Sequence, residues 1–468
     1  MKNYDVAIIG GGTAGLTAAA HSIQLGAKTV IIEKRKIGGD CTWFGCIPSK
    51  TLLKIASIAH EARMSKKYGL EMNVSEVNLA EVMEKIQETI LNVYAEESPE
   101  KLKEEGIDVL FGSAKFLDSH RILVGDQEIS ANKILIATGA SPYIQNIPGL
   151  NLVNYLTYEN IWQLKKLPDH LIVLGGGAVG CELAQSFRRL GSNVTLIEQG
   201  TRLLPHEDKQ ASKVIAQVFE EDGVNLKLST SPDSVWQDSS GIHLKLGEEE
   251  VVCDVLLVAT GRKPNVSDLS MDKAGINFNE EGIFVDNYLR TSQKHIYVAG
   301  DCIGSYQFSH YAGWQAAMAI RNALLPGNSS GKSNNVPGTI FTDPEIAQIG
   351  LLEEEAREKF GKKCLVYERP MNNVDRARTE FNMHGFLKII YHRNGTILGV
   401  TIVGARAGET INEWSLAMQK KMSVMELSNS IHVYPTFSIL NMQASASIRM
   451  KQLLGGSMGK FLKGKVKR

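Results

Sequence analysis

The chain has 468 residues, six of them cysteine, and its 51 basic and 51 acidic side chains give a formal net charge of zero. This length predicts about three domains, and the charge balance gives no reason to expect a nucleic-acid groove. No apolar run reaches the roughly 18 residues of a transmembrane helix. The first residues lead straight into a strand and leave no room for a signal peptide, and the cysteine content is not typical of a disulfide framework. We therefore expect a cytoplasmic protein.

The first predicted element is the apolar strand at 6–9, which ends in the Gly-rich turn GGGTAG at 10–15. A second predicted strand, at 29–33, ends in Glu33. Glycines at this spacing permit a tight turn and a close approach of backbone to pyrophosphate, and a carboxylate about 20 residues later accepts hydrogen bonds from ribose hydroxyls. Gly10, Gly12, Gly15 and Glu33 therefore predict a dinucleotide site.

Two cysteines, Cys41 and Cys46, follow in the stretch GGDCTWFGCIPSK at 38–50. In a regular helix their Cα atoms would lie about 8.7 Å apart, whereas a disulfide needs about 4.4–6.8 Å. The segment must therefore be distorted, which Gly45 permits, before a helix at 49–59 whose N-terminus would stabilise a thiolate. No second pair completes a zinc site. A dinucleotide site beside a cysteine pair indicates electron transfer between a flavin and a disulfide.

The next stretch, at 81–106, is rich in Glu and Lys and has apolar residues at helical spacing, which predicts a surface helix inserted in the first module. These apolar positions are Val82, Ile86, Ile90 and Val93.

The first module has a second copy. Gly175, Gly177 and Gly180 repeat the glycine spacing, and Glu198, like Glu33, stands 23 residues after the first glycine of its copy. Two such modules imply two dinucleotides, and strands alternating with helices predict parallel, doubly wound sheets.

Each copy later has an Ala-Thr-Gly at the end of an apolar strand, at 134–139 and 255–261, which adds Thr138, Gly139 and Gly261 to the predicted cofactor-binding residues. Because the first copy precedes the cysteines, it should hold FAD, and the second should hold the nicotinamide. Glu198 would repel a 2′-phosphate and favours NADH. Arg202, four residues later, keeps NADPH open.

Beyond a predicted linker at 327–335 the pattern changes. Strand-like runs at 339–341, 386–391 and 397–403 mix with helical runs at 352–360 and 409–420, which predicts a separate α+β domain. The basic residues at 459–468 predict a solvated tail.

The stretch around the cysteines resembles the class I pyridine nucleotide-disulfide oxidoreductases, whose usual form is G-G-x-C-x-x-x-G-C-x-P-S-K. This family includes dihydrolipoyl dehydrogenase, glutathione reductase and mercuric reductase. The segments FTDPEIAQIG at 341–350 and GARAGE at 404–409 also resemble the family. The resemblance implies an α/β protein with two doubly wound dinucleotide-binding modules and a C-terminal α+β dimerisation domain. We predict FAD-binding parts at 1–149 and 269–335, an NAD(P)-binding domain at 150–268 and a dimerisation domain at 336–468.

The resemblance also implies roles for individual residues. Cys41 would be the outer thiol that meets the acceptor, and Cys46 the inner thiol that faces the flavin. Lys50 and Glu182 would pair beside the flavin N5, and Asp301, in YVAGD at 297–301, would contact FAD. Because the C-terminal domain of this family closes the partner's active site, the resemblance predicts a homodimer.

The chain departs from the family in one segment. Thiol–disulfide members carry His-Pro-Thr and, five residues after the His, a Glu, whereas HVYPTFSI at 432–439 has Tyr434 and Ile439 at these positions. An imidazole with a pKa of about 6.5 exchanges protons at neutral pH, but a phenol with a pKa of about 10 is a poor base. His432 is an alternative base, shifted by about 6.6 Å along an extended chain, although a structural or interface histidine is favoured.

Mercuric reductases also lack this His-Glu pair and have a Tyr-bearing segment there, but they use a C-terminal cysteine pair, and the last cysteine here is Cys364. We also expect no N-terminal metal-binding domain. The resemblance therefore favours a mercuric-reductase-like branch without these cysteines.

The expected enzyme passes electrons from NAD(P)H through FAD and the Cys41–Cys46 disulfide to a disulfide or a soft metal ion. Tyr434 would face the other subunit's Cys41. Dihydrolipoyl dehydrogenase and a non-catalytic flavin-binding protein remain alternatives. No resident metal is predicted. Four other cysteines have no partner at motif spacing and are expected to be buried: Cys181, Cys253, Cys302 and Cys364.

Overall fold

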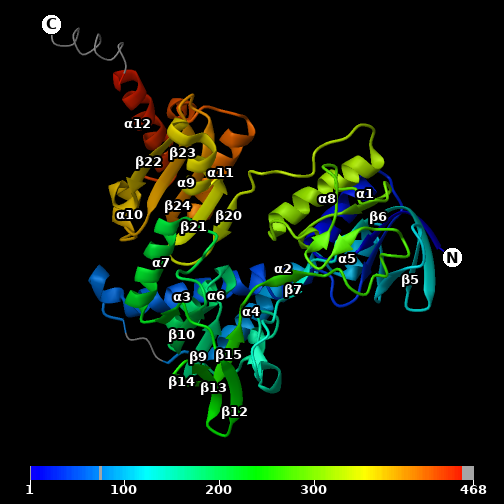
Figure 1. The fold of residues 1–468 in the computed structure, drawn as a ribbon, viewed down its shortest axis with the longest axis horizontal. Helices are drawn as coiled ribbons and strands as arrows, with labels where there is room; N and C mark the ends of the chain where they lie inside the picture. The colour runs from blue at the N-terminus through cyan, green and yellow to red at the C-terminus, as the bar shows by residue number, and fades with distance from the viewer. Residues whose placement is uncertain (1, 73–75, 456–468) are drawn as a thin grey trace. The chain divides into compact units, whose positions relative to one another are not determined.

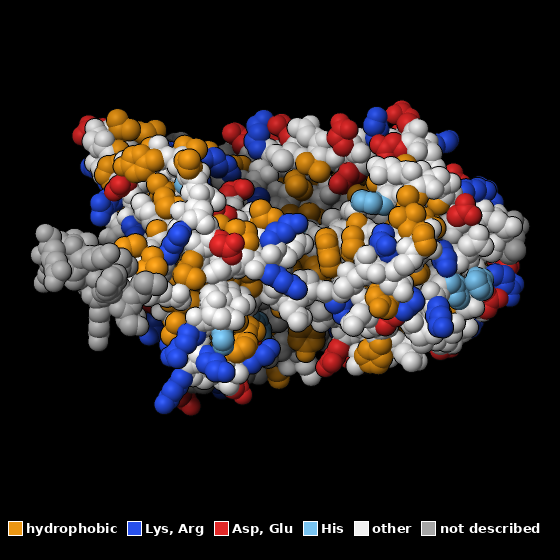
Figure 2. Space-filling model, turned by 90° about the horizontal axis from the view of Figure 1, so that it is seen from above, with side chains coloured by type: hydrophobic (Ala, Val, Ile, Leu, Met, Phe, Trp, Pro, Cys, Tyr) orange, Lys and Arg blue, Asp and Glu red, His pale blue; other side chains and the backbone are white. Residues whose placement is uncertain are grey.

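The computed structural model describes residues 2–72 and 76–455. The chain divides into two compact units, one formed by residues 1–199 and 223–333 and the other by residues 200–222 and 334–468. The domain boundaries at 149, 268 and 335 stay a prediction, and the predicted tail at 459–468 lies outside the described residues. In the described part of the chain, no helix combines the length and the apolar character needed to cross a bilayer. On the face drawn in Figure 2, acidic and basic side chains are interspersed.

The first unit contains a seven-stranded sheet (Figure 1). Its strands are β1 (Lys2–Ile9), β2 (Thr29–Glu33), β3 (Asp108–Phe111), β4 (Ala114–Phe116), β5 (Arg121–Val124), β6 (Gln127–Ile136) and β19 (Ile296–Val298). The order is β3-β2-β1-β6-β5-β4, with β19 also paired to β6. β1, β2, β3, β6 and β19 run parallel, while β4 and β5 pair antiparallel. The predicted parallel arrangement of the first module is confirmed.

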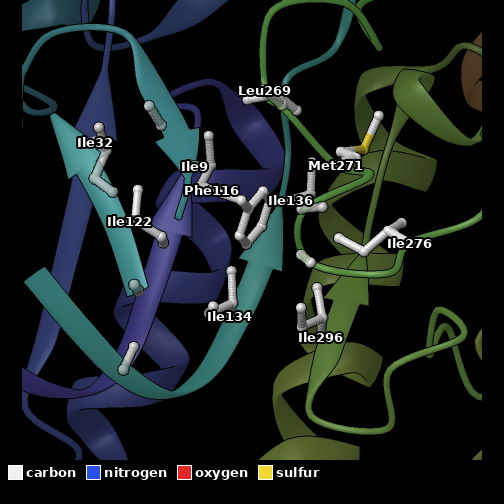
Figure 3. Packing of buried hydrophobic residues seen from close by; sticks show 14 of the residues in the cluster. Ile9, Ile32, Phe116, Ile122, Ile134, Ile136, Leu269, Met271, Ile276 and Ile296 are labelled. Atoms are coloured by element: carbon white, nitrogen blue, oxygen red, sulfur yellow. The ribbon is translucent and has the colours of Figure 1, made fainter. Parts of the chain in front are cut away.

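Both faces of this sheet are covered. Ile9 and Ile32 point to one face, where they pack with Phe116 and with apolar side chains from the segment at 266–283 (Figure 3). Their neighbours Ile8 and Ile31 point to the other face and pack against helices α1 (Thr13–Gln24) and α8 (Ser309–Leu324). Because successive side chains of a strand alternate between faces, a continuous apolar strand needs cover on both sides.

Helices α1 and α8 pack closely because alanines line their contact. These alanines are Ala14, Ala18 and Ala19 of α1 and Ala312, Ala316 and Ala319 of α8. The two helices follow β1 and β19, which both pair in parallel with β6. Their N-termini therefore lie at the same edge of the sheet, the edge that carries the first Gly-rich turn.

A second parallel sheet in this unit has the order β11-β10-β9-β15-β8. Its strands are β8 (Tyr155–Leu156), β9 (His170–Leu174), β10 (Asn193–Glu198), β11 (Asn225–Leu228) and β15 (Val255–Val258), and helix α6 (Ala178–Leu190) follows β9. The smaller sheets are β12 (Ser234–Asp238), β13 (Gly241–Leu246) and β14 (Glu249–Cys253), then β7 (Ala140–Pro142) with β16 (Arg262–Pro264), and β17 (Phe278–Asn279) with β18 (Gly282–Ile283). The predicted second module is confirmed.

The single surface helix predicted at 81–106 is two helices. The helices between β2 and β3 are α2 (Gly39–Trp43), α3 (Cys46–Arg63), η1 (Ser65–Tyr68), α4 (Leu79–Ala95) and α5 (Pro99–Glu104). The Ser98 hydroxyl caps α5 by accepting the Lys101 N–H at 3.3 Å, and Pro99 favours a helix start rather than a continuation. The buried stripe of α4 is also shifted, since Leu79 and Met83 are buried while Val82 and Val93 are half-buried.

The second unit contains an antiparallel sheet of order β20-β21-β24-β23-β22. Its strands are β20 (Gly338–Ile340), β21 (Glu345–Gly350), β22 (Cys364–Pro370), β23 (Phe386–His392) and β24 (Ile397–Gly404), and its helices are α7 (Lys209–Asp222), α9 (Glu353–Phe360), α10 (Asp375–Thr379), α11 (Ala407–Gln419) and α12 (Ile439–Gly455). The remaining 3-10 helices are η2 (Leu150–Leu152), η3 (Ile161–Gln163), η4 (Asp301–Ile303), η5 (Gly361–Lys363), η6 (Met371–Asn373) and η7 (Glu426–Asn429). The predicted α+β character is confirmed, and the predicted linker lies in a stretch, 325–337, without helix or strand.

The segment at 200–222 belongs to this second unit, although the sequence places it directly after the second module's Glu198. Lys388 of β23, only 7% exposed, places its Nζ 2.9 Å from an oxygen of the buried Asp208 carboxylate. A buried ammonium needs such a partner. This ion pair fixes the segment that leads into α7 against the antiparallel sheet.

Candidate active site

The two predicted redox cysteines lie at the junction of two helices. Cys41 is in α2, Cys46 is the first residue of α3, and the helical path breaks at Phe44 and Gly45. Gly45 donates its N–H to the Asp40 carbonyl at 2.7 Å, and a Cβ on Gly45 would stand only 3.2 Å from that oxygen. The predicted distortion at Gly45 is confirmed, and the helix expected at 49–59 begins already at Cys46.

Both cysteines carry free thiols, and each thiol shifts the pKa of the other. The hydrogen bond to Cys46, together with burial, raises the pKa of the Cys41 thiol. The same hydrogen bond lowers the pKa of Cys46 to about 6, with help from Ser309 and Lys50 and against the effect of burial. At neutral pH the negative charge therefore rests on Cys46. The four other cysteines are buried, as predicted.

Lys50 and Glu182, predicted to pair, are in contact. The Lys50 Nζ lies 2.8 Å from Glu182 Oε2, which joins α3 to α6 across 132 residues of sequence. The Glu182 side chain is 8% exposed and that of Lys50 is 37% exposed, so the carboxylate is the buried partner. Lys50 stands one helical turn after Cys46 on the same helix, and its positive charge favours the Cys46 thiolate.

The first Gly-rich turn is packed so closely that two of its glycines have no room for a side chain. Gly10 has φ +112°, and a Cβ there would lie 2.2 Å from the Ala137 carbonyl oxygen. A Cβ on Gly15 would lie 1.9 Å from the Gly10 oxygen. The buried Glu33 carboxylate accepts the Gly11 N–H at 2.7 Å. The turn is thus held between two strand ends, with a carboxylate against it.

The second turn repeats this geometry. Gly175 has φ +109°, and its Cβ would lie 2.4 Å from the Ala259 oxygen. A Cβ on Gly180 would lie 1.9 Å from the Gly175 oxygen, and the buried Glu198 carboxylate accepts the Gly176 N–H at 2.6 Å. The two modules therefore share the glycine spacing and also the hydrogen bond that the acidic residue accepts from the turn.

Other glycines of the two modules face open space, which fits bound dinucleotides. Among the described residues, no heavy atom lies within 4 Å of a Cβ built on Gly177 or Gly139. A Cβ built on Gly12 would have only the Gly39 Cα within 4 Å, at 3.6 Å. The Cβ of Gly261 would have its nearest neighbour at 3.9 Å. Internal packing therefore does not require glycine for space at these positions. The positive φ of Gly139, +69°, and of Gly261, +137°, favours glycine there through backbone conformation, whereas Gly12 and Gly177 have no such constraint and leave their backbone open to a ligand.

Thr138, predicted to bind the cofactor, is hydrogen-bonded to a neighbouring loop. Its hydroxyl donates to the Asn265 carbonyl at 2.7 Å, and its carbonyl accepts from the Asn265 side chain at 2.9 Å. These bonds tie the end of β6 to the segment after β16.

An ionic cluster that the sequence reasoning missed lies beside the first cysteine. Arg262 contacts Asp40 at 2.6 Å and Asp301 at 2.9 Å, and its Nε donates to the Tyr158 hydroxyl at 3.2 Å. Burial raises the pKa of Asp40 to about 6 in spite of the Arg262 charge. Asp40 stood inside the cysteine motif, but 222 residues separate it from Arg262, so spacing gave no sign of the pair.

Two hydroxyls were also missed. The Ser309 Oγ at the start of α8 lies 3.2 Å from the Cys46 Sγ. Thr13, at the start of α1, lowers the pKa of the Cys41 thiol. Ser309 belongs to no motif that the sequence singled out, whereas Thr13 lies inside the first Gly-rich turn, and the side-by-side packing of α1 and α8 brings both residues to the sulfurs.

The segment with the substituted His-Glu pair lies in the second unit. Tyr434 is 63% exposed and donates its hydroxyl to Asp375 at 3.0 Å, which raises the pKa of the phenol. Ile439, the first residue of α12, is buried in the core of this unit. That Tyr434 faces the partner's cysteine stays a prediction.

His432, the alternative base, is held within its own unit. Its side chain is 9% exposed, and its Nε2 lies 2.8 Å from Glu413, whose other oxygen accepts from Asn441 at 2.8 Å. Its Nδ1 faces the Ser430 carbonyl at 3.3 Å. Both ring nitrogens are thus engaged, which favours the structural role.

Comparison with known proteins identifies the family. A sequence model described as "Pyridine nucleotide-disulphide oxidoreductase" matches residues 4–318, and one described as the dimerisation domain of that family matches residues 336–443. The mercuric reductase of Bacillus cereus is 35% identical over 442 residues, which cover 93% of this chain and 70% of the relative. The dihydrolipoyl dehydrogenase of Thermus scotoductus is 32% identical over 475 residues, which cover 97% of this chain and 99% of the relative.

Comparison with solved structures leads to the same family. The HOCl-induced flavoprotein disulfide reductase RclA of Escherichia coli, determined as a Cu(II) complex, matches with a TM-score of 0.87 and 29% identity over 96% of this chain and all of that chain. LpdA of Mycobacterium tuberculosis matches with a TM-score of 0.88 and 29% identity over the same share of each chain. The chain therefore belongs to the pyridine nucleotide-disulfide oxidoreductases, as an FAD-dependent enzyme that uses NAD(P)H and carries the dimerisation domain of that family.

Proposed function

We propose that the protein passes electrons from NADH through FAD to a Cys41–Cys46 disulfide and from there to a soft metal ion or a disulfide. The sulfur pair carries this proposal. The two thiols shift each other's pKa, and Cys41 together with Ser309 and Lys50 lowers the pKa of Cys46 to about 6. Lys50 stands one helical turn after Cys46. A thiol pair with one stabilised thiolate is suited to thiol–disulfide chemistry.

Bound FAD would take up a hydride from the nicotinamide and supply the electron pair that the disulfide needs. In this proposal the first Gly-rich turn and Glu33 hold its ADP part, Asp301 its ribityl chain, and Lys50 with Glu182 orient the nicotinamide. When the S–S bond breaks, two electrons and one proton give a Cys41 thiol and a Cys46 thiolate. The hydrogen bond from Cys41 and the Lys50 charge stabilise that thiolate.

The second module favours NADH over NADPH. The Glu198 carboxylate stands at the turn where a 2′-phosphate would add negative charge. Arg202 is not free to compensate, since it donates to the Glu207 carbonyl at 2.8 Å and to the Ser212 hydroxyl at 2.7 Å.

We therefore expect kcat/KM for NADH to exceed that for NADPH by about 100-fold, the order that a like-charge repulsion of about 3 kcal/mol produces. Steady-state rates with both coenzymes measure this ratio. Glu198→Gln should narrow the ratio by weakening the repulsion. Equal or better use of NADPH by the unaltered protein would contradict this assignment.

The class of electron acceptor is proposed from the two residues that replace the family's His-Glu pair. Tyr434 is a phenol bound to Asp375, and Ile439 is part of a core, so neither supplies the proton exchange that a dithiol substrate requires. Reduction of a soft metal ion needs no such base. The names of two similar proteins, a mercuric reductase and a reductase solved with Cu(II), support this acceptor class.

Dihydrolipoyl dehydrogenase remains the second candidate. The His432–Glu413 contact at 2.8 Å is an imidazole–carboxylate pair in the segment where that activity needs one. Use of this pair would require His432 to release one of its present contacts.

The dimerisation domain supports a homodimer. We further propose a cytoplasmic enzyme, because six cysteines in a chain of 468 residues are not typical of the disulfide framework of a secreted protein.

A thiol count tests the relay. The sequence has six cysteines, so oxidised protein, unfolded without reductant, should show four reactive thiols, and protein treated with NADH under anaerobic conditions should show six. Mass spectrometry after alkylation should assign the two additional thiols to the peptides of Cys41 and Cys46. An unchanged count after NADH, with the flavin reduced, would contradict a disulfide relay.

A further inference from the structure

Ser309 stands where the charge of the sulfur pair settles. It is the first residue of α8, and its Oγ lies 3.2 Å from the Cys46 Sγ. The same hydroxyl also lowers the pKa of the Cys41 thiol. Among the described residues, the Cys46 sulfur is the only hydrogen-bond partner of its side chain.

A hydroxyl with only a sulfur partner has a definite orientation once that sulfur is charged. An O–H donates most strongly to an anion, and a half-buried thiolate loses hydration that such a donor replaces. Ser309 enters from α8, whereas Cys46 and Lys50 belong to α3, so the donor is fixed independently of the helix that carries the thiolate.

We propose that Ser309 is a further catalytic residue, whose hydroxyl donates to the Cys46 sulfur in the reduced enzyme and stabilises the negative charge on that sulfur. This inference rests on the proposed relay and adds a residue to it. In the oxidised enzyme the hydroxyl has no thiolate partner, so reduction of the S–S bond creates the acceptor for its proton.

The charged and titratable groups that act on Cys46 are known from the structure. Cys41 donates to it and Lys50 favours its thiolate, while the Glu182 charge opposes that thiolate. Asp40, on α2, is also affected by the Cys46 charge. Replacing Ser309 leaves all four in place, so a change in the pKa of Cys46 can be assigned to the hydroxyl.

The test compares Ser309→Ala and Ser309→Thr in the FAD-loaded dimer. The pH midpoint of the long-wavelength thiolate–flavin band of the reduced enzyme is measured, together with the midpoint for alkylation of Cys46 by iodoacetamide, followed by mass spectrometry. Ser309→Ala should raise both midpoints by about 1 pH unit, or about 1.4 kcal/mol at 1.36 kcal/mol per unit. Ser309→Thr, which keeps a hydroxyl, should stay near the unaltered protein.

Ser57→Ala is the matched control, because the Ser57 hydroxyl, on the same helix as Cys46, donates to Glu61 at 3.4 Å and contacts neither sulfur nor Lys50. It should leave both midpoints unchanged. Unchanged midpoints in Ser309→Ala would overturn the role of Ser309 while leaving the relay intact. Absence of the band at every pH in the unaltered protein would instead overturn the relay itself. The alkylation midpoint does not require flavin, so it decides the question even if a variant loses FAD.

Discussion

Replacing Cys46 with serine is expected to abolish the long-wavelength band that a thiolate gives beside oxidised flavin and to slow acceptor reduction by about 1,000-fold or more. The reason is that the Cys46 sulfur holds the negative charge of the reduced pair and is half of the S–S bond. Stopped-flow absorbance under anaerobic conditions measures both effects. Reduction of the flavin by NADH should continue in this variant.

Cys41→Ser is the matched variant. It keeps the Cys46 thiolate, so it should show the band without any reductant, yet it should lose acceptor reduction to a similar extent. A band that survives in Cys46→Ser and disappears in Cys41→Ser would reverse the assignment of inner and outer thiols.

The second large effect concerns the acceptor. Oxidation of dihydrolipoamide by NAD⁺ is expected to be about 100- to 10,000-fold slower than flavin reduction by NADH, because a positioned acid–base group contributes about that factor. The phenol of Tyr434 does not replace it, since its hydrogen bond to Asp375 raises its pKa further. Rates with dihydrolipoamide, Hg(II) and Cu(II) at equal enzyme concentration measure the difference.

In this panel at least one of the metal ions should be reduced faster than dihydrolipoamide is oxidised. Fast dihydrolipoamide turnover would show that His432 or another group acts as the base and would favour the second candidate. Glu413→Gln then tests whether His432 is the base or another group is, because this substitution removes the carboxylate that contacts His432.

The parts of the fold that repeat or alternate were predictable from the sequence. The two Gly-rich turns carry their own constraint, since a side chain at Gly10 or Gly175 would collide with a carbonyl oxygen. The distortion between the cysteines followed from helix geometry and the place of Gly45. By contrast, the break between α4 and α5 depended on Ser98 and Pro99, whose capping pattern was overlooked in a stretch of uniform composition.

The contacts around the sulfurs could not be predicted from the spacing of residues in the sequence, because they form when elements far apart in the chain pack together. Ser309 meets Cys46 across 263 residues. The Arg262–Asp40 pair forms in a similar way, between β16 and the short helix α2. The sequence did identify Lys50 and Glu182, but only because the resemblance links two charges that would otherwise suggest solvated helix faces.

The central claim, a disulfide that exchanges electrons with the flavin, is tested most directly by anaerobic titration with NADH. A flavin alone takes up one electron pair, whereas a flavin and a disulfide take up two. We therefore predict that the first equivalent of NADH per FAD produces the thiolate–flavin band while the flavin stays oxidised, and that full bleaching needs about two equivalents. Complete bleaching with a single equivalent and no band would contradict the account.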